Sequence, residues 1–436
     1  MSSINYKDKI KDLVYNYYQD FHLSKKKIIP SKDYIPVTIK TFDEKEIINL
    51  VDSSLEFWLT SGRYNDQFQE KLSKFTNIKF CSTVNSGSSA NLIALSCLTS
   101  EKIGKRKLEK GDEVITVASG FPTTINPILQ NNLVPVFLDV KLGHYNLDCS
   151  QLEKSLSKKT KAVMIAHTLG NPFDIQKVHH FCKENNLFLI EDCADALGAK
   201  YDGKMVGTFG NIATTSFYPA HHITTGEGGA VMTNSNLLKF IIESFRDWGR
   251  DCYCDPGVEN TCCKRFDWQL GDLPHGYDHK YIYSHAGYNL KMTDMQAAIG
   301  VSQLDKIENF IDKRKINFDR LKSAFSHLND YLILPEYEEK AEPSWFGFPL
   351  TIRDDSPEVR KNLMKHYEQS KIGTRLLFGG NITKQPYMKN RSYRIVGDLK
   401  NSDKIMNSTY WIGLHPQINE EHIEYMFDIT KKFFKN

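Results

Sequence analysis

Two adjacent histidines, His221 and His222, lie in a stretch that combines strand-like, histidine and glycine residues. The stretch opens with Thr, Ser, Phe and Tyr and ends in a Gly-rich turn before a second apolar run. An imidazole has an unperturbed pKa of about 6.5, so such a side chain can move protons near neutral pH. Glycines permit positive φ angles and close backbone approach. The stretch indicates a proton-transfer site, although an arbitrary histidine at a strand end is more often structural.

Cysteines form a second group with chemical potential. Three lie close together as Cys252-x-Cys254-x7-Cys262, and Cys263 follows directly. Thiolates at such spacing suit zinc or an iron–sulfur cluster, and spacing alone favours neither over reduced thiols without a metal. The chain has nine cysteines, an odd number with no paired framework, so we expect reduced thiols or metal ligands in a cytoplasmic protein. Four others stand in apolar or helical contexts and are expected to be buried: Cys81, Cys97, Cys149 and Cys182.

Two further sites could hold an anion or a ring nitrogen. A polar turn, Ser86-Gly87-Ser88-Ser89, feeds an Ala/Leu-rich helix. Free N–H groups at a helix start suit a phosphate, although many helices begin with such caps. Asp192 follows an apolar strand, where its carboxylate could pair with a protonated ring nitrogen or merely cap a helix.

The elements that must position these residues alternate between strand and helix. Apolar runs at 114–117, 134–138, 162–166 and 187–190 predict strands, and 121–131, 148–157 and 174–186 predict helices. This alternation predicts an α/β fold with a parallel sheet whose ligands bind beyond the carboxyl ends of the strands. Residues 43–75 look helical, and 302–328 predict a long helix.

The chain divides into three expected parts: an N-terminal helical arm (1–42), a large domain (43–310) with a cysteine-bearing loop near 250–286, and a small C-terminal domain (311–436). The 436 residues are 40% hydrophobic and carry a net charge of +3, which gives no strong attraction to nucleic acid or membranes. No stretch is apolar enough to span a bilayer, and the first residues do not read as a signal peptide. We therefore expect a cytoplasmic protein.

The His221 segment resembles the active-site segment of the DegT-type sugar aminotransferases, through Ser-Phe-x-x-x-[base]-x-Ile-Thr-x-Gly-Glu-Gly-Gly-Ala-Val. Members of that family are vitamin B6-dependent, and a lysine at the base position holds pyridoxal phosphate as a Schiff base. Here that position is His221, and an imidazole cannot form this imine. The resemblance therefore implies non-covalent pyridoxamine or pyridoxal 5'-phosphate, with His221 as catalytic base. With histidine in place of lysine, the segment resembles the ketodeoxysugar 3-dehydrases and 3-dehydratases. The missing lysine disfavours an ordinary aminotransferase.

The resemblance covers nearly the whole chain and implies a fold-type I, aspartate aminotransferase-like large domain with a parallel-rich sheet, plus a smaller C-terminal α/β domain. It implies that Asn289, in Gly287-Tyr288-Asn289, reaches the coenzyme phosphate of a neighbouring subunit, so we expect a homodimer with shared sites. The other residues it points to are Gly87, Ser88, Ser89 and Ser216 for the phosphate, Asp192 for the pyridine nitrogen, Phe121 for stacking or plain core, Asp195 near the coenzyme, and Arg375 for a sugar-nucleotide diphosphate or the surface.

The loop cysteines resemble those of the CDP-4-keto-6-deoxy-D-glucose 3-dehydrases, which join the B6 site to a [2Fe-2S] cluster bound by four cysteines. The resemblance assigns Cys252, Cys254 and Cys262, and Cys193 as the fourth ligand. Cys193 lies one position before the place that the family's spacing gives, which holds Ala194. A one-residue shift reverses the side-chain face on a strand, and we expect the backbone that leaves the strand to absorb it. Cys263 is an alternative within the loop.

The implied function is removal of the carbon-3 hydroxyl from a CDP-4-keto-6-deoxyhexose in 3,6-dideoxy sugar synthesis for O-antigen-type polysaccharides. An NADH-dependent flavoprotein reductase would supply electrons through the cluster. One alternative is a GDP-4-keto-6-deoxymannose-type 3-dehydratase, which recycles its coenzyme with glutamate and lacks a cluster; the loop cysteines argue against it. The other is a non-catalytic relative kept as a sensor or scaffold, which the joint presence of Asp192, Ser216 and His221 disfavours.

Overall fold

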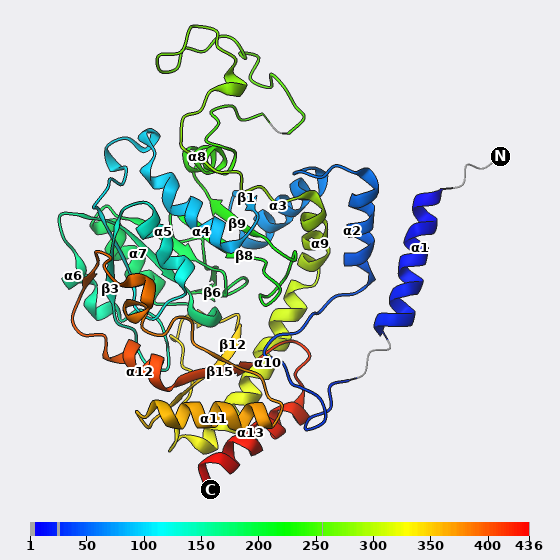
Figure 1. Cartoon of the computed structure of the whole chain (residues 1–436), viewed down its shortest axis with the longest axis vertical. Coiled ribbons are helices and arrows are strands. Elements are labelled where there is room, and N and C mark those ends of the chain that lie inside the picture. Colours follow the sequence, from blue (N-terminus) through cyan, green and yellow to red (C-terminus); the bar gives the residue numbers. More distant parts are fainter. Residues whose placement is uncertain (1–4, 24–26, 255, 436) are drawn as a thin grey trace.

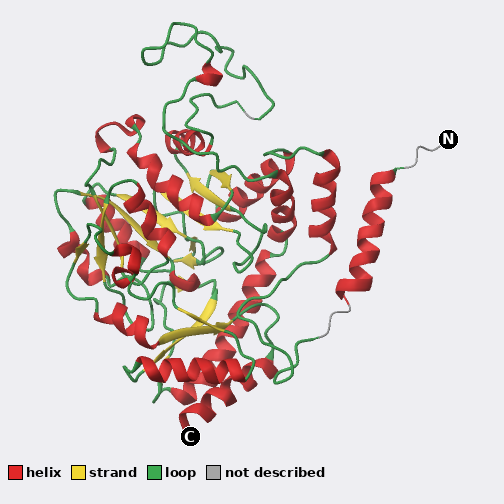
Figure 2. Ribbon diagram, viewed as in Figure 1, coloured by secondary structure: helices red, strands yellow, loops and turns green. Residues whose placement is uncertain are grey.

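An eight-stranded sheet forms the centre of the large domain in the computed structural model, which describes residues 5–23, 27–254 and 256–435 (Figures 1 and 2). Six neighbouring strands run parallel, as predicted, and β9 and β1 join antiparallel at one side. In sheet order the strands are β1 (Phe80–Val84), β9 (Gly229–Thr233), β8 (Ile212–Ser216), β5 (Phe188–Asp192), β4 (Thr160–Ala166), β2 (Glu113–Val117), β3 (Val134–Leu138) and β14 (Arg394–Ile395).

Helices cover both faces of this sheet, which is why its strands are apolar on both sides. Along β4, Val163 and Ile165 pack in the cluster that contains α7 residues, whereas Ala162 and Met164 pack in the cluster of α4 and α8. The helices of the large domain are α2 (Glu44–Glu56), α3 (Arg63–Thr76), α4 (Gly87–Ser96), α5 (Pro122–Gln130), α6 (Leu152–Ser155), α7 (Ile175–Glu184), α8 (Asn236–Arg246) and α9 (Asp294–Leu304).

A four-stranded antiparallel sheet and four helices form the smaller C-terminal unit, around a core that includes Phe318, Phe348 and Tyr410. Its strands, in sheet order, are β10 (Leu332–Ile333), β12 (Gly347–Ile352), β15 (Thr409–Gly413) and β13 (Thr374–Leu376), and its helices are α10 (Ile307–Phe325), α11 (Pro357–Gln369), α12 (Lys400–Ser408) and α13 (Glu420–Lys435). The expected boundary at residue 310 falls inside α10, and β14 returns from the C-terminal part to pair with β3. Three short strands form a third sheet: β11 (Ala341–Glu342), β6 (Lys200–Tyr201) and β7 (Lys204–Met205).

Two of the expected helical stretches are divided in the structure. The 43–75 stretch splits into α2 and α3, because Phe57 adopts a left-handed conformation (φ 54°) that ends α2. The 302–328 stretch divides between the end of α9, α10 and a 3-10 turn at Ser326–Leu328. In the N-terminal arm, α1 (Tyr6–Tyr18) lies beside α2, where Lys7 pairs with Asp52 at 2.9 Å (Figure 1). Residues 1–4 and 24–26 of that arm lie outside the described residues.

No helix within the described ranges is both long and apolar enough to cross a membrane.

One buried carboxylate ties α9 to the start of α3. Asp294 Oδ1 accepts hydrogen bonds from the backbone N–H groups of Gly62 (3.0 Å) and Asn65 (2.8 Å), and Oδ2 accepts one from Tyr64 (3.3 Å). These are N–H groups at the first turn of α3, which have no partner inside the helix. Asp294 is 1% exposed, so it supplies partners that water cannot replace.

Replacing Asp294 with alanine should lower the free energy of unfolding by about 2–4 kcal/mol, because buried donors lose their acceptor. Urea titration of the variant and the wild type measures this difference. The matched control is Asp305→Ala, which removes an exposed pair with Lys71 (2.6 Å) and should cost less than about 1 kcal/mol. Equal losses in the two variants would contradict the role given to Asp294.

Candidate active site

A cavity of ≈ 570 Å³ gathers most of the residues expected to do chemistry. It lies at the carboxyl ends of β5 and β8, where a parallel sheet is expected to bind its ligand. Of the expected site residues, those that line it are Gly87, Ser88, Phe121, Asp192, Asp195, Ser216, His221 and Arg375. The lining includes side chains from both the large domain and the C-terminal unit, so both parts build the site.

Asp192 stands at the end of β5 with three hydrogen-bond donors. Its Oδ2 accepts from Asn91 Nδ2 (2.8 Å) and Thr124 Oγ1 (2.7 Å), and its Oδ1 accepts from the backbone N–H of Ala194 (3.1 Å). Asn91 is held in turn, because its Oδ1 accepts from Thr214 Oγ1 (2.6 Å). These donors fix the position of the Asp192 carboxyl at the cavity, where it can pair with a protonated ring nitrogen.

Sequence reasoning missed Asn91 and Thr124. Asn91 stands in the otherwise apolar run Ala90–Leu95 and is 2% exposed. A buried amide needs hydrogen-bond partners, so this polar residue inside an apolar helix was the signal that could have found it. Thr124 gives no comparable signal.

The start of α4 fits a phosphate group. Ser86 caps the helix, accepting from the Ser89 N–H at 3.1 Å, and the first two helical residues, Gly87 and Ser88, line the cavity. A methyl group in place of a Gly87 hydrogen would lie 2.5 Å from Ser216 Cβ, so only glycine lets α4 approach β8 this closely. A helix N-terminus beside a serine hydroxyl favours an anion. Ser89 does not line the cavity, since its hydroxyl donates to Asn85 Oδ1 at 2.6 Å.

His221 lies in the turn after β8, where its backbone N–H donates to the Tyr218 carbonyl (2.9 Å). Its ring centroid is 5.2 Å from that of Phe346, and its Nδ1 is 3.4 Å from Asp195 Oδ1. Burial, reinforced by the nearby Arg314 guanidinium, lowers the pKa of His221 to about 4. The imidazole is therefore neutral at pH 7 and can accept a proton. His222, by contrast, is buried against the Ser344 carbonyl (2.9 Å), which is a structural role.

Asp195 is the acidic neighbour of this base. Burial and the negative charge of Asp192 raise the pKa of Asp195 to about 7, although the Arg314 guanidinium opposes the shift. Arg314 is itself 3% exposed and donates to the carbonyls of Trp345, Phe346 and Leu414. The sequence placed Asp195 near the coenzyme, and the structure places it beside His221.

Three other expected residues lie in different settings. Phe121 is 48% exposed at the cavity, so the plain core interpretation is wrong and its ring is available for stacking. Arg375, on β13, is exposed and donates to its neighbour's carbonyl (Thr374, 2.8 Å), which leaves its guanidinium accessible to an anion. Asn289 is exposed outside this cavity and accepts from Lys291 Nζ (2.7 Å), so its role in a neighbouring subunit stays a prediction.

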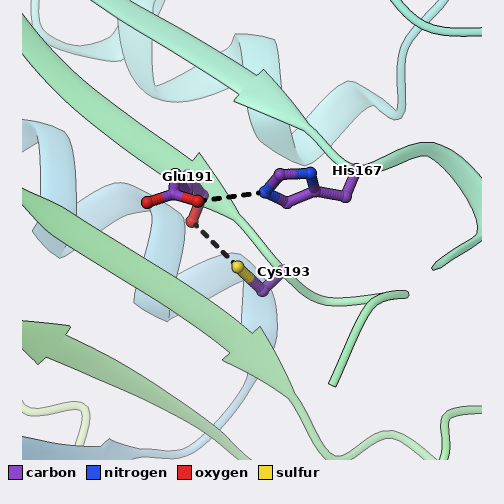
Figure 3. A group of neighbouring side chains, drawn as sticks. All are labelled: His167, Glu191 and Cys193. Atoms are coloured by element: carbon purple, nitrogen blue, oxygen red, sulfur yellow. Dashed lines mark hydrogen bonds and ion pairs between the residues drawn. The ribbon is translucent and has the colours of Figure 1, made fainter. Parts of the chain in front are cut away.

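The structure separates Cys193 from the other expected cluster ligands. Cys252, Cys254 and Cys262 are half-buried in the loop that projects beyond α8 (Figure 1). Cys193 is buried, and its Sγ groups with ligand atoms of His167 and Glu191 within 4.8 Å (Figure 3). Ala194 lines the cavity and Cys193 does not, because the Cys193 side chain packs in the core. The role of Cys193 as a cluster ligand with the three loop cysteines stays a prediction.

Residues 41–431 match the DegT/DnrJ/EryC1/StrS aminotransferase family. The chain belongs to this family. It is 54% identical to the lipopolysaccharide biosynthesis protein RfbH of Salmonella typhimurium, over 100% of this chain and 99% of that protein. It is 51% identical to the dTDP-4-dehydro-2,6-dideoxy-D-glucose 3-dehydratase of Saccharopolyspora spinosa, over 90% of this chain and 84% of that enzyme. The structure of E. coli GDP-4-keto-6-deoxy-D-mannose-3-dehydratase with bound hydrated pyridoxal phosphate matches with a TM-score of 0.80 and 27% identity, over 93% of this chain and all of the other.

These comparisons confirm the predicted fold, which is that of the pyridoxal phosphate-dependent sugar aminotransferases and dehydratases, with a large mixed sheet. The chain is an enzyme of this vitamin B6-dependent family, and sugar-nucleotide 3-dehydratases are among its relatives. The helix start, Asp192 and Phe121 fit the phosphate, nitrogen and ring of that coenzyme respectively.

Replacing Asp195 with asparagine should change how stability depends on pH. The folded protein keeps the Asp195 proton up to about pH 7, whereas the unfolded chain releases it near its ordinary pKa of about 4. The folded state of the wild type therefore loses stability as pH rises through this window. Without coenzyme, the variant should gain about 2 kcal/mol relative to the wild type between pH 5 and pH 8.

Urea unfolding at the two pH values measures this difference. The exposed Asp202→Asn is the control and should show no such gain. An Asp195→Asn difference that is the same at both pH values would contradict the raised pKa.

Proposed function

We propose that this enzyme is a C3 dehydrase of a nucleotide-linked 4-keto-6-deoxyhexose, with pyridoxamine 5'-phosphate bound non-covalently. The observation that carries the proposal is that His221 and Asp192 line the same cavity. No lysine is among the described residues that line it. An aminotransferase of this family needs a lysine there to hold the aldehyde form of the coenzyme. A histidine keeps proton transfer and gives up that covalent bond.

The coenzyme's binding groups are set by the large domain. Gly87 and Ser88 at the start of α4, with the Ser216 hydroxyl, would hold the phosphate, and Asp192 would pair with the ring nitrogen. Phe121 would lie against the ring. When bound, this coenzyme supplies an amine that joins the carbon-4 carbonyl and an electron sink for the bonds that change.

His221 is the proposed base. Its ring lines the cavity, and its Nδ1 lies 3.4 Å from Asp195 Oδ1. The lowered pKa keeps this imidazole free of a proton at neutral pH, so it is ready to act as acceptor. The proton taken up by the His221 ring is then available to the hydroxyl that leaves carbon 3, which departs as water.

Arg375 supports the choice of a nucleotide sugar. Its exposed guanidinium lies at the cavity on β13, where it can pair with a diphosphate. We propose CDP as the nucleotide, because the cysteine-bearing loop resembles that of the CDP-sugar branch. A product in 3,6-dideoxy sugar synthesis for a lipopolysaccharide O-antigen agrees with the Salmonella relative, which is a lipopolysaccharide biosynthesis protein.

The loop cysteines support a reductive second half-reaction. We propose a [2Fe-2S] cluster at this loop, reduced by an NADH-dependent flavoprotein reductase, in a cytoplasmic homodimer with shared sites. Cys252, Cys254 and Cys262 provide three soft donors on one segment. Cys193, which is buried beside Glu191 and His167, is the proposed fourth donor, and Cys263 is the alternative on the loop itself.

The variant His221→Asn should bind pyridoxamine phosphate and consume a CDP-4-keto-6-deoxyhexose at least about 100-fold more slowly, because it lacks the proton acceptor. Coenzyme absorbance reports binding, and chromatography of the sugar nucleotide reports turnover. His180→Asn, on the exposed face of α7, is the control and should behave like the wild type. Turnover of His221→Asn at the wild-type rate would remove His221 as the base.

The variant His221→Lys tests whether residue 221 occupies the position at which a lysine would bind the coenzyme covalently. With a lysine beside Asp192, pyridoxal phosphate should attach covalently, and borohydride should fix it to residue 221. Mass spectrometry of the digested protein locates the label. The wild type treated in the same way should stay unlabelled there; a borohydride-stable adduct on the wild type would revive an ordinary aminotransferase.

The second candidate is a GDP-4-keto-6-deoxymannose-type 3-dehydratase, which the structural match to the E. coli enzyme favours. It would recycle its coenzyme with glutamate and need no cluster. Incubating the holoenzyme with substrate and glutamate, without a reductant, separates the two. We expect no sustained turnover and no 2-oxoglutarate; steady formation of 2-oxoglutarate would favour the second candidate.

A further inference from the structure

A second cavity, of ≈ 280 Å³, shares one residue with the active-site cavity. Its walls come mainly from residues 39–42, α2, the turn after β8, α9 and α10. Among the described residues, His221 alone lines both cavities. The proposed base therefore borders a space that has no part in the proposed reaction, and the side chains around that space indicate what it can bind.

Arg314 of α10 is the group in this second cavity that most needs a partner. Its side chain is 3% exposed, and it lines the second cavity but not the active-site cavity. Its Nη1 donates to the backbone carbonyls of Trp345 (3.3 Å), Phe346 (3.0 Å) and Leu414 (3.2 Å). Its Nε and Nη2 make no hydrogen bond within the described part of the chain. These two nitrogens form one edge of the guanidinium, and such an edge can bind both oxygens of one carboxylate.

The positive charge of Arg314 is only partly balanced. No carboxylate of the described residues forms an ion pair with it, and Asp195 interacts with it electrostatically. Burial and the negative charge of Asp192 raise the pKa of Asp195 to about 7, so this carboxyl is only partly ionised near neutral pH. A buried cation is costly unless a negative charge is paired with it. The balance of charge therefore favours an anion beside Arg314.

The other charged residues that line the second cavity do not neutralise Arg314. The Glu46 carboxylate is already held by Lys306 Nζ, which lies 2.6 Å from each of its oxygens, and by Gln303 Nε2 at 2.7 Å. Lys40 is exposed, and its ammonium has no partner among the described residues. The second cavity therefore has an excess of positive charge, to which Lys40 and Arg314 both contribute.

The rest of the lining is largely apolar, with side chains from α2, α9, α10 and the segment before α2. These apolar residues are Ile39, Phe42, Ile47, Leu50, Ile299 and Phe310. A buried apolar cavity of about 150 Å³ is large enough to hold benzene, so the second cavity has room for a chain or ring of about six carbons. Apolar walls with a few placed polar groups are typical of a small-molecule site.

We propose that the second cavity is a binding site for a small organic acid, with its carboxylate on the Nε and Nη2 edge of Arg314 and its apolar part against α2 and α9. Lys40 adds a second positive charge that favours the same ligand class. The site itself does not depend on the proposed reaction, because it requires neither the coenzyme nor the iron–sulfur cluster.

The effect of such a ligand on catalysis does rest on the proposed function. The Arg314 guanidinium disfavours a proton on His221, and a carboxylate bound to Arg314 would offset that charge. The bound acid would therefore make His221 a stronger proton acceptor. Because coupling between two sites is reciprocal, protonation of His221 would in turn strengthen binding of the acid.

The test is a calorimetric titration of sodium hexanoate into the full-length protein, saturated with pyridoxamine phosphate, in a chloride-free buffer. The coenzyme occupies the phosphate position of the active-site cavity, so hexanoate has no access to that anion site. Hexanamide is the matched ligand without a charge. Ile47→Trp fills the cavity, Lys40→Gln removes the charge of Lys40, and Lys45→Gln on the exposed face of α2 is the control. Arg314 is left intact because its Nη1 holds three backbone carbonyls.

We expect one hexanoate site per chain, with hexanamide bound at least about tenfold more weakly because it has no carboxylate to pair with the guanidinium. Lys40→Gln should weaken hexanoate binding about threefold to tenfold, and Lys45→Gln should leave it unchanged. Ile47→Trp should abolish it. Coenzyme absorbance shows which variants are folded.

The inference is overturned if the wild type does not bind hexanoate, or if it binds hexanamide equally well. Full binding by folded Ile47→Trp would place the ligand elsewhere and overturn it too. If Ile47→Trp does not fold, the two lysine variants decide, since equal affinities in Lys40→Gln and Lys45→Gln would contradict the site. None of these measurements requires turnover, so their failure leaves the proposed function standing, and an inactive protein leaves this binding site standing.

Discussion

The active site depends on a buried carboxyl group at the end of the central strand β5. Removing a charged carboxyl from water is costly unless hydrogen bonds replace the lost hydration. Asp192 obtains those bonds from Asn91 on α4 and Thr124 on α5, so the two helices are fixed against β5 by the group that the coenzyme needs. Because Gly87 begins the same helix one turn before Asn91, a single helix sets the distance between the phosphate end and the nitrogen end of the site.

Because side chains alternate along β5 and the residues that follow it, one face of this segment is directed to the cavity and the other to the core. Asp192 and Ala194 face the cavity side, whereas Glu191 and Cys193 group with His167 inside the body. The Glu191 carboxylate holds the turn at 207–210, and that turn in turn covers Cys193. A cysteine at position 194 would line the cavity, whereas Cys193 packs in the core. A shift of one residue therefore changes the environment of the side chain from the core to the cavity.

A structural feature could be predicted from the sequence where a local pattern of residues determines it. The parallel strands were predicted because strands buried on both faces are continuous apolar runs, and Asp192 was predicted because it follows such a run. The break between α2 and α3 depends on Phe57 in a left-handed conformation, and the strand β14 depends on pairing with β3 from far along the chain. Neither the break nor this pairing has a local sequence pattern that predicts it. The partners of Asp192 and the burial of Cys193 were also set by tertiary packing.

Electrostatics explains why a histidine suits the base position of this cavity. Asp192 and Asp195 both line it, and the buried Arg314 guanidinium interacts electrostatically with Asp195. Asp192 has three hydrogen-bond donors, and burial together with the negative charge of Asp192 raises the pKa of Asp195 to about 7. Arg314 and burial both disfavour a second cation at residue 221, which keeps the imidazole neutral. A lysine amine there would also be deprotonated more easily, but it would bind the aldehyde coenzyme, whereas a neutral imidazole can only move a proton.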